Sequence, residues 1–449
     1  MVFCGVDIGS TNLKVGLSDG AGLLRHVEIV PTPRRQDAGQ PVTDPATLLR
    51  RIEELILRAW RAAGARPITA VCTTGVGEDG LLLDADLRPL APVIPWFDRR
   101  ASDDATHIRA SAAATLRAGI AMDPARTGAK WRWLARCQPD LMARARLWVA
   151  LTDYPLIAWG AAPFMAETLA ARTGCYDPVA RGWIAPLLAE CNAPPLPPVI
   201  PAGRIVGRMT SPRLIAAGAA TPQTLLVAGG HDHPVAASTI LRSDPAAQID
   251  SLGTASVLYA ELPVAPAVTP ALMARSVPVR GGPGLALIGV VALTEALSAA
   301  ASPAEIRAFL QALPLPGEAG QPQPLSPDRP DARPIRAVLE AAAMTTRAML
   351  EGLPPGALHA TGGWSRSEGL LHLRASVLDR TILAAEEPEL ALVGAVLLAA
   401  EAAGAPTDFR PRSRAIAPLP QWRDAYAAIW PDFLDRLQSA RNHADGGGL

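Results

Sequence analysis

Three short segments of this chain carry residue types that suit phosphate chemistry. The first, Asp7 to Lys14, has the sequence DIGSTNLK and lies between two apolar runs. A turn of Gly, Ser and Thr can present N–H groups and hydroxyls to phosphate oxygens, and an aspartate just before it can hold Mg2+ through water. Asp7 is therefore a candidate metal ligand, and an ordinary polar hairpin is the alternative for this segment alone. The candidate phosphate-binding residues of the turn are Ser10, Thr11, Asn12 and Lys14.

The other two segments lie in the second half of the chain. SLGT at 251–254 and ATGG at 360–363 each follow an apolar run and contain glycine at the expected turn. Glycine at such a turn lets the backbone approach a phosphate or a nucleotide closely. Because the second half repeats the arrangement of the first, a shared phosphate-binding role is favoured over an ordinary hairpin.

A fourth pattern, GVGEDG at 75–80, matches the GxGxxG fingerprint of dinucleotide-binding proteins. That fingerprint requires a helix that begins inside the motif. Here an apolar run, LLLD, follows and leads to a turn at 84–86, which predicts a strand and a hairpin. We therefore do not expect a dinucleotide site.

The elements that must position these segments alternate between strands and helices. The apolar alternation at 2–8 and 13–17 predicts a hairpin. Residues 45–63 have helical spacing and precede an expected strand at 68–73. A second series begins with an expected strand at 225–228. This order of elements predicts an α/β fold.

The overall composition restricts the class of protein. The chain has 449 residues and 42 Lys and Arg against 42 Asp and Glu, so no basic surface for nucleic acid is expected. Hydrophobic residues make up 49%, which excludes a disordered chain and at this length predicts two large domains. The five cysteines form no CxxC pair, and the N-terminal sequence MVFCGVDIGSTN lacks the features of a signal peptide. We therefore expect a cytoplasmic protein with reduced thiols and no membrane association.

In their order, these motifs resemble the FGGY carbohydrate kinases over nearly the whole chain. A phosphate hairpin in each half, followed by a Gly-Gly turn before a helix, is the layout of the actin-like ATPase and sugar-kinase superfamily. The FGGY family adds Trp-x-Asp-x-Arg, Lys-x-x-Trp, Gly-Gly-x-Asp, Leu-Gly-Thr and Arg-Ala-x-x-Glu segments and a final apolar Gly-Ala helix. The matching residues are Asp7 to Thr11, Trp96, Asp98, Arg100, Lys130 to Trp133, Gly229, Gly230, Asp232, Leu252 to Thr254, Arg336, Ala337, Glu340, Gly362, Gly363, Gly394 and Ala395.

The resemblance implies an ATP-dependent kinase with two actin-like (ribonuclease H-like) domains and an active site in the cleft between them. It makes Asp232 the general base that takes the proton of the attacking hydroxyl, a role that phosphoryl transfer needs. Mg2+ would be held by Asp7 and Asp232. A zinc site in His231-Asp232-His233 is the alternative, and the sequence offers no third ligand motif for it. The residues implied to bind ATP are Ser10, Thr11, Asn12, Lys14, Gly253, Thr254, Gly362, Gly363 and Ser367.

The sugar is expected against the N-terminal half. Carboxylates, guanidinium groups and an aromatic face are the groups that hold polyols. An internal ion pair is the alternative for Asp98 and Arg100, and a core position is the alternative for Trp96. The family commonly places a polar substrate-binding residue beside the base. The candidate sugar contacts are Glu78, Asp79, Trp96, Asp98, Arg100 and His233.

The chain also departs from the family. Gly77-Glu78 stands where the xylulokinases have Met-His, so the identity of the sugar stays open, and the segment between 314 and 334 is short.

We expect an N-terminal sugar-binding domain at 1–224 and a C-terminal ATP-binding domain at 225–449. The expected activity is transfer of the γ-phosphate of ATP to a hydroxyl of a small ketose or polyol. The alternative is a catalytically silent sugar-binding or regulatory relative. The expected partners are the sugar and ATP, with a homodimer as an option.

Overall fold

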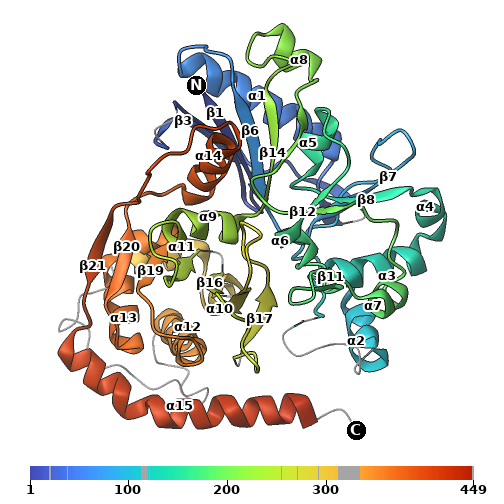
Figure 1. Cartoon of the computed structure of the whole chain (residues 1–449). Coiled ribbons are helices and arrows are strands. Elements are labelled where there is room, and N and C mark those ends of the chain that lie inside the picture. The colour runs from blue at the N-terminus through green and yellow to red at the C-terminus, as the bar shows by residue number, and fades with distance from the viewer. Residues whose placement is uncertain are drawn as a thin grey trace.

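The computed structural model describes residues 1–19, 22–37, 39–112, 120, 122–253, 255–270, 272–291, 293–311 and 334–446. Thr254 and residues 314–333 of the short segment lie outside the described residues. Within these ranges the strands form two large mixed sheets, each flanked by helices, in two lobes (Figure 1). The expected α/β fold with two sheet-containing domains is therefore confirmed.

The first sheet has three parallel strands at its centre, β1 (Phe3–Ile8), β6 (Ala70–Gly75) and β14 (Leu225–His231). β2 (Asn12–Ser18) folds back antiparallel on β1, as the hairpin pattern predicts. The strand order is β13-β14-β6-β1-β2-β3. The two outer strands are β3 (Leu24–Pro31) and β13 (Ile205–Arg208).

The first sheet extends past the domain boundary expected at residue 224. That boundary places β14 in the second domain, but β14 pairs with β6 in parallel register, with Leu226 opposite Val71. Strand pairing joins segments that are far apart in sequence, so an apolar run alone does not show which sheet it enters.

Helices cover both faces of the first sheet because alternate residues of β1 point to opposite sides. Val6 belongs to the core cluster that includes α1 (Pro45–Ala62), whereas Phe3 packs with α14 (Leu390–Ala402) on the other face. A side chain at Gly5 would place its Cβ 2.8 Å from the carbonyl oxygen of Leu392, so α14 approaches β1 closely. Figure 1 shows α14 beside the strands of the first lobe, although it lies near the C-terminus.

The second sheet is built around β15 (Gln248–Leu252), which pairs antiparallel with β16 (Ser256–Leu262) and parallel with β19 (Leu358–Thr361). One face packs on α9 (Asp232–Leu241) and the other on α12 (Pro334–Glu351) and α13 (Glu368–Leu378). The other elements of this lobe are β17 (Met273–Ser276), β18 (Leu285–Val291), β20 (Ile382–Ala385), β21 (Ser413–Ile416), α10 (Leu293–Ala300), α11 (Pro303–Gln311), η1 (Gly363–Arg366) and α15 (Pro420–Gly446).

The helix α9 lies where the two lobes meet. Its apolar residues pack on the second sheet, while its other side crosses α14. At this crossing a Cβ on Gly394 would lie 2.2 Å from the carbonyl oxygen of Val235, so only glycine allows the contact. Asp232 is the first residue of α9 and directly follows β14. The candidate base therefore stands at the junction of the lobes.

The remaining elements belong to the first lobe. β7 (Gly80–Leu83) pairs antiparallel with β8 (Leu147–Ala150), so a strand and not a helix follows the GxGxxG match, as expected. No helix in the described ranges combines the length and the apolar character needed to cross a membrane. The other elements here are β4 (Arg35–Asp37), β5 (Gln40–Val42), α2 (Ser102–Ser111), α3 (Thr127–Cys137), α4 (Pro139–Arg144), α5 (Tyr154–Ala158), β9 (Met165–Ala166), α6 (Glu167–Ala170), β10 (Tyr176–Asp177), β11 (Gly182–Trp183), α7 (Ala185–Glu190), β12 (Val199–Ile200) and α8 (Pro212–Ala216).

Candidate active site

Strand register brings three loops to one edge of the first sheet. β1, β6 and β14 are parallel, and their last residues Ile8, Gly75 and His231 are partners across the sheet. The chain therefore leaves all three strands at the same edge, which is where open α/β sheets bind ligands. The segments that emerge there are residues 9–12, 76–78 and 232–233.

The second sheet presents its glycine turns in the same way. Ser251 of β15 is the register partner of Thr361 of β19, so Gly253 and Gly362 follow at one edge. Gly362 has a φ of +89°, and a Cβ there would lie 2.4 Å from the carbonyl oxygen of Leu252. Only glycine fits this conformation and this close approach.

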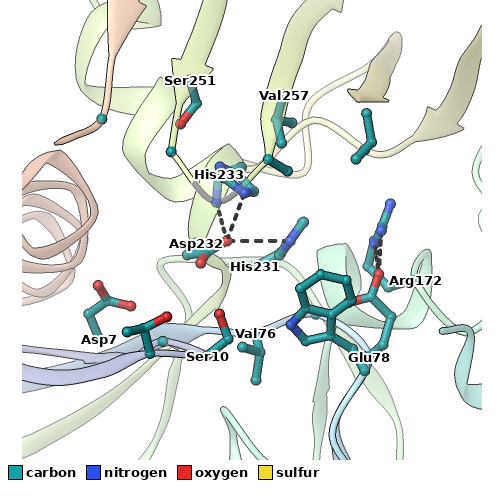
Figure 2. Close-up of a pocket in the computed structure, with 18 of the residues that line it drawn as sticks. Asp7, Ser10, Val76, Glu78, Arg172, His231, Asp232, His233, Ser251 and Val257 are labelled. Atoms are coloured by element: carbon teal, nitrogen blue, oxygen red, sulfur yellow. Dashed lines mark hydrogen bonds and ion pairs between the residues drawn. The ribbon is translucent and has the colours of Figure 1, made fainter. Parts of the chain in front are cut away.

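These two edges face each other across a cleft pocket of about 270 Å³. Figure 2 shows Ser251 and Val257 of the second lobe opposite Ser10 and Val76 of the first. The predicted site residues that line the pocket are Asp7, Ser10, Thr11, Asn12, Lys14, Glu78, Trp96, Asp232, His233, Gly253 and Gly362.

The first turn is closed by its own backbone. The N–H of Gly9 donates to the carbonyl oxygen of Asn12 at 3.0 Å, and the Thr32 hydroxyl donates to the carbonyl oxygen of Gly9 at 2.7 Å. The guanidinium of Arg34 donates to the carbonyl oxygen of Ser10. These hydrogen bonds hold the turn in one conformation at the C-terminal end of β1. A phosphate site needs its N–H groups and hydroxyls fixed in this way before the ligand binds.

Asp7 is a buried carboxylate close to other acidic groups. Lys14, its partner across the hairpin, lies 3.8 Å away and makes a shorter ion pair of 2.6 Å with Glu389. Burial raises the pKa of Asp7 to about 7; repulsion from Asp232 and Glu389 adds to the shift and Lys14 opposes it. Asp7 Oδ1 has no hydrogen-bond partner among the described residues. An unpaired carboxylate oxygen beside a second carboxylate fits a hard cation such as Mg2+.

The carboxylate of Asp232 meets two imidazoles. Its Oδ1 accepts a hydrogen bond from the backbone N–H of His233 at 2.7 Å. The same oxygen lies 3.4 Å from Nε2 of His231 and 3.8 Å from Nε2 of His233 (Figure 2). Burial, together with Arg172 and His233, lowers the pKa of His231 well below its usual value, so this imidazole is neutral at physiological pH. The Asp232 side chain is 27% exposed, so the cleft reaches it.

Glu78 is held by two arginines that were not among the predicted site residues. Nε of Arg172 donates to Glu78 Oε1 at 2.7 Å, and Nη1 of Arg126 lies 3.6 Å from the same oxygen. Arg126 also bonds Asp123 at 3.2 Å. Arg172 lies in the run AART at 170–173, which resembles an Ala-Ser-Arg-Thr-like run of the FGGY carbohydrate kinases, and this resemblance is the sequence signal for it. Glu78 and Arg172 both line the cleft.

Three predicted sugar contacts lie outside the pocket lining, in internal ion pairs. Asp79 is buried 3.7 Å from Nζ of Lys130, which also donates to a backbone carbonyl. Burial raises the pKa of Asp79 to about 6, although Lys130 opposes the shift. Asp98 accepts two hydrogen bonds from the Arg100 guanidinium, at 2.9 and 2.7 Å, and Arg100 lies over the Trp133 ring. Asp98 and Arg100 thus form the internal ion pair that was the alternative to sugar contact.

Two predicted nucleotide contacts also lie outside the pocket lining. Gly363 begins the short helix η1, and open space surrounds the position its Cβ would take. The Ser367 hydroxyl caps α13 by accepting from the N–H of Leu370 at 3.4 Å, and it donates to the carbonyl of Leu310 at 2.7 Å. This hydroxyl therefore has a structural role, and its contact with adenosine stays a prediction.

Two models of one protein family match this chain. The model of the FGGY family of carbohydrate kinases, N-terminal domain, matches residues 2–238, and that of the C-terminal domain matches residues 289–403. The chain belongs to the FGGY family of carbohydrate kinases. The N-terminal match runs past residue 224, as does the first sheet.

Individual relatives are more distant. The xylulose kinase of Escherichia coli (strain K12) is 26% identical over 267 residues, which are 58% of this chain and 54% of that protein. The chain thus spans about half the length of this relative. The solved structures of xylulose kinase and gluconate kinase from Lactobacillus acidophilus each match with a TM-score of 0.81 and 19% identity over 98% of both chains. These two structures support the fold, and their equal scores do not distinguish between sugars.

Proposed function

We propose that this protein is an ATP-dependent carbohydrate kinase that transfers the γ-phosphate of ATP to a hydroxyl of a small ketose or polyol. The observation that carries the proposal is the position of Asp232. It stands at the junction of the lobes, in the same pocket as the first phosphate turn, Asp7 and the glycine turns of the second sheet. Phosphoryl transfer depends on positioning, charge neutralisation and a carboxylate base, and this cleft offers all three.

The phosphates of ATP would lie between the two lobes. The 10–12 turn supplies N–H groups and hydroxyls from one side, and Gly253 and Gly362 let the backbone approach from the other. Asp7 and Asp232 would hold Mg2+, which supplies charge neutralisation on the phosphates when bound. The Lys14 ammonium, already paired with Glu389, would contribute less charge to the phosphates than an unpaired lysine.

The sugar would lie at the end of the cleft near Glu78. The two arginines on Glu78 fix its carboxylate, which can then accept hydrogen bonds from sugar hydroxyls, and Trp96 offers an aromatic face. The hydroxyl that attacks would donate its proton to Asp232. Closure of the lobes would exclude water and so limit the hydrolysis of ATP.

A panel of pentuloses, hexuloses, tetruloses and polyols, assayed for ADP release, tests this function. At least one of them should stimulate ADP release, and Asp232→Asn should lower that turnover by about 10²–10⁴-fold while ADP still binds. Wild-type turnover in Asp232→Asn would refute the assignment of the base. A sugar that binds without any ADP release would instead favour the silent sugar-binding relative.

A further inference from the structure

We propose that His231, Asp232 and His233 form a site for a borderline transition-metal ion, with Zn2+ as the expected occupant, at the base of the cleft. Each residue offers one donor atom, and the three donors lie within 4.8 Å of one another. Two imidazoles and a carboxylate are a donor set that Zn2+ and its neighbours prefer. The three residues are consecutive, and the change from strand β14 to helix α9 directs their donors to a common point (Figure 2).

The distances are close to those of a bound ion. Asp232 Oδ1 lies 3.4 Å from His231 Nε2 and 3.8 Å from His233 Nε2. Zinc bonds of about 2.0–2.1 Å in a tetrahedron put neighbouring ligand atoms roughly 3.3 Å apart. His231 Nε2 is already close to this spacing, and a small rotation of the His233 ring would complete three of the four ligand positions. The fourth position would face the cleft and take water.

The His231 ring is held in place by close packing against a glycine. A Cβ on Gly77 would lie 3.0 Å from Cδ2 and 3.2 Å from Nε2 of this ring, so a larger side chain there would displace it. His231 Nδ1 has no hydrogen-bond partner in the part of the chain that is described. Metal-bound histidines usually donate this second N–H to a carboxylate or carbonyl. The absence of such a hydrogen bond at His231 predicts weaker binding than at a structural zinc site.

Access and charge also favour a cation here. The side chains of Asp232 and His233 are 27% and 32% exposed, so an ion can enter from the cleft. Three cationic groups act on these residues, and each is already paired: Arg172 and Arg126 with Glu78, and Lys14 with Glu389. Mg2+ prefers an octahedron of oxygen ligands and would not use the imidazoles, so this site would select a transition metal over Mg2+.

Direct binding measurements test the site without reference to catalysis. Titration of the full chain with Zn2+ in calorimetry, and with Co2+ followed by its visible d–d absorption, should each show one ion per chain. His231→Asn and His233→Asn should each weaken binding by at least about tenfold. His107→Asn is the matched control, because this exposed imidazole lies 3.2 Å from Glu190 but belongs to no group of three metal donors among the described residues. Equal zinc affinity in wild type and in the folded double variant, or an equal loss in the control, would overturn the site.

A second arm of the test rests on the proposed kinase function. Zinc bound to Asp232 would occupy the oxygen and the space that the attacking hydroxyl needs. Micromolar Zn2+ should therefore raise the apparent KM for the sugar, and His231→Asn should remove this effect of zinc, because it removes an imidazole that the Mg2+ site does not use. Zinc inhibition of equal strength in wild type and in His231→Asn would place the zinc at the Mg2+ site and overturn the proposal. If no sugar is phosphorylated, the kinase function fails, and the calorimetric and Co2+ measurements still decide the metal site.

Discussion

The buried ion pair between Glu78 and Arg172 offers a quantitative test of the sugar end of the cleft. The two side chains are 7% and 11% exposed, so water screens their interaction little. Replacing one partner of a buried pair costs about 3–5 kcal/mol because the other charge stays buried without compensation. In Arg172→Met the carboxylate would keep Arg126 at 3.6 Å. We therefore expect Arg172→Met to lower the free energy of unfolding by about 3 kcal/mol, the lower end of this range.

Urea unfolding of a double-mutant cycle measures this pair directly. The four proteins are wild type, Arg172→Met, Glu78→Gln and the double variant, and we expect a coupling of about 1.5–3 kcal/mol. Arg51→Met is a matched control, because its 3.0 Å pair with Glu54 is about 40% exposed and should change stability by less than about 1 kcal/mol. If the two cleft substitutions add within about 0.5 kcal/mol, the reasoning on the buried pair is refuted.

The same variants separate a structural role of Glu78 from a sugar contact. Glu78→Gln keeps the shape of the side chain and removes its charge, so a direct contact predicts a higher KM for the sugar or a changed choice of sugar. Slow hydrolysis of ATP without sugar should stay at its wild-type rate. An unchanged substrate profile would leave Glu78 with a structural role alone.

The remaining predictions concern a buried carboxyl and a glycine turn. Burial raises the pKa of Asp153 to about 8, with the hydrogen bond from the Ala166 N–H opposing the shift. Because the folded pKa exceeds the unfolded one, the free energy of unfolding should fall as pH rises toward about 8, by at most about 1.4 kcal/mol per pH unit. Asp153→Asn should flatten this slope in urea unfolding at several pH values. Equal slopes in wild type and variant would contradict the raised pKa of Asp153. Gly362→Ala adds a Cβ 2.4 Å from the Leu252 carbonyl oxygen at a φ of +89°. We expect a strain of about 1–3 kcal/mol and weaker ADP binding in calorimetry, and wild-type ADP affinity would exclude this turn from the nucleotide site.

The sequence by itself determined the local parts of the site. Apolar alternation around a Gly-Ser-Thr turn predicted the hairpin of β1 and β2, and glycine after β15 and β19 predicted the turns of the second sheet. These features depend on backbone conformations that a few neighbouring residues specify. For the same reason the strand after Gly80 could be distinguished from the helix of a dinucleotide site. The order of the motifs then identified the family, which the domain matches confirm.

The tertiary structure decided which charged groups face the cleft. Lys14 meets Glu389 across 375 residues and Glu78 meets Arg172 across 94, and no local pattern records such pairs. Asp79 is buried beside Lys130 whereas its neighbour Glu78 lines the cleft, and only packing shows this difference. β14 likewise entered the first sheet by pairing with β6. Long-range pairing and burial depend on how distant segments pack together, and this information is absent from residue spacing.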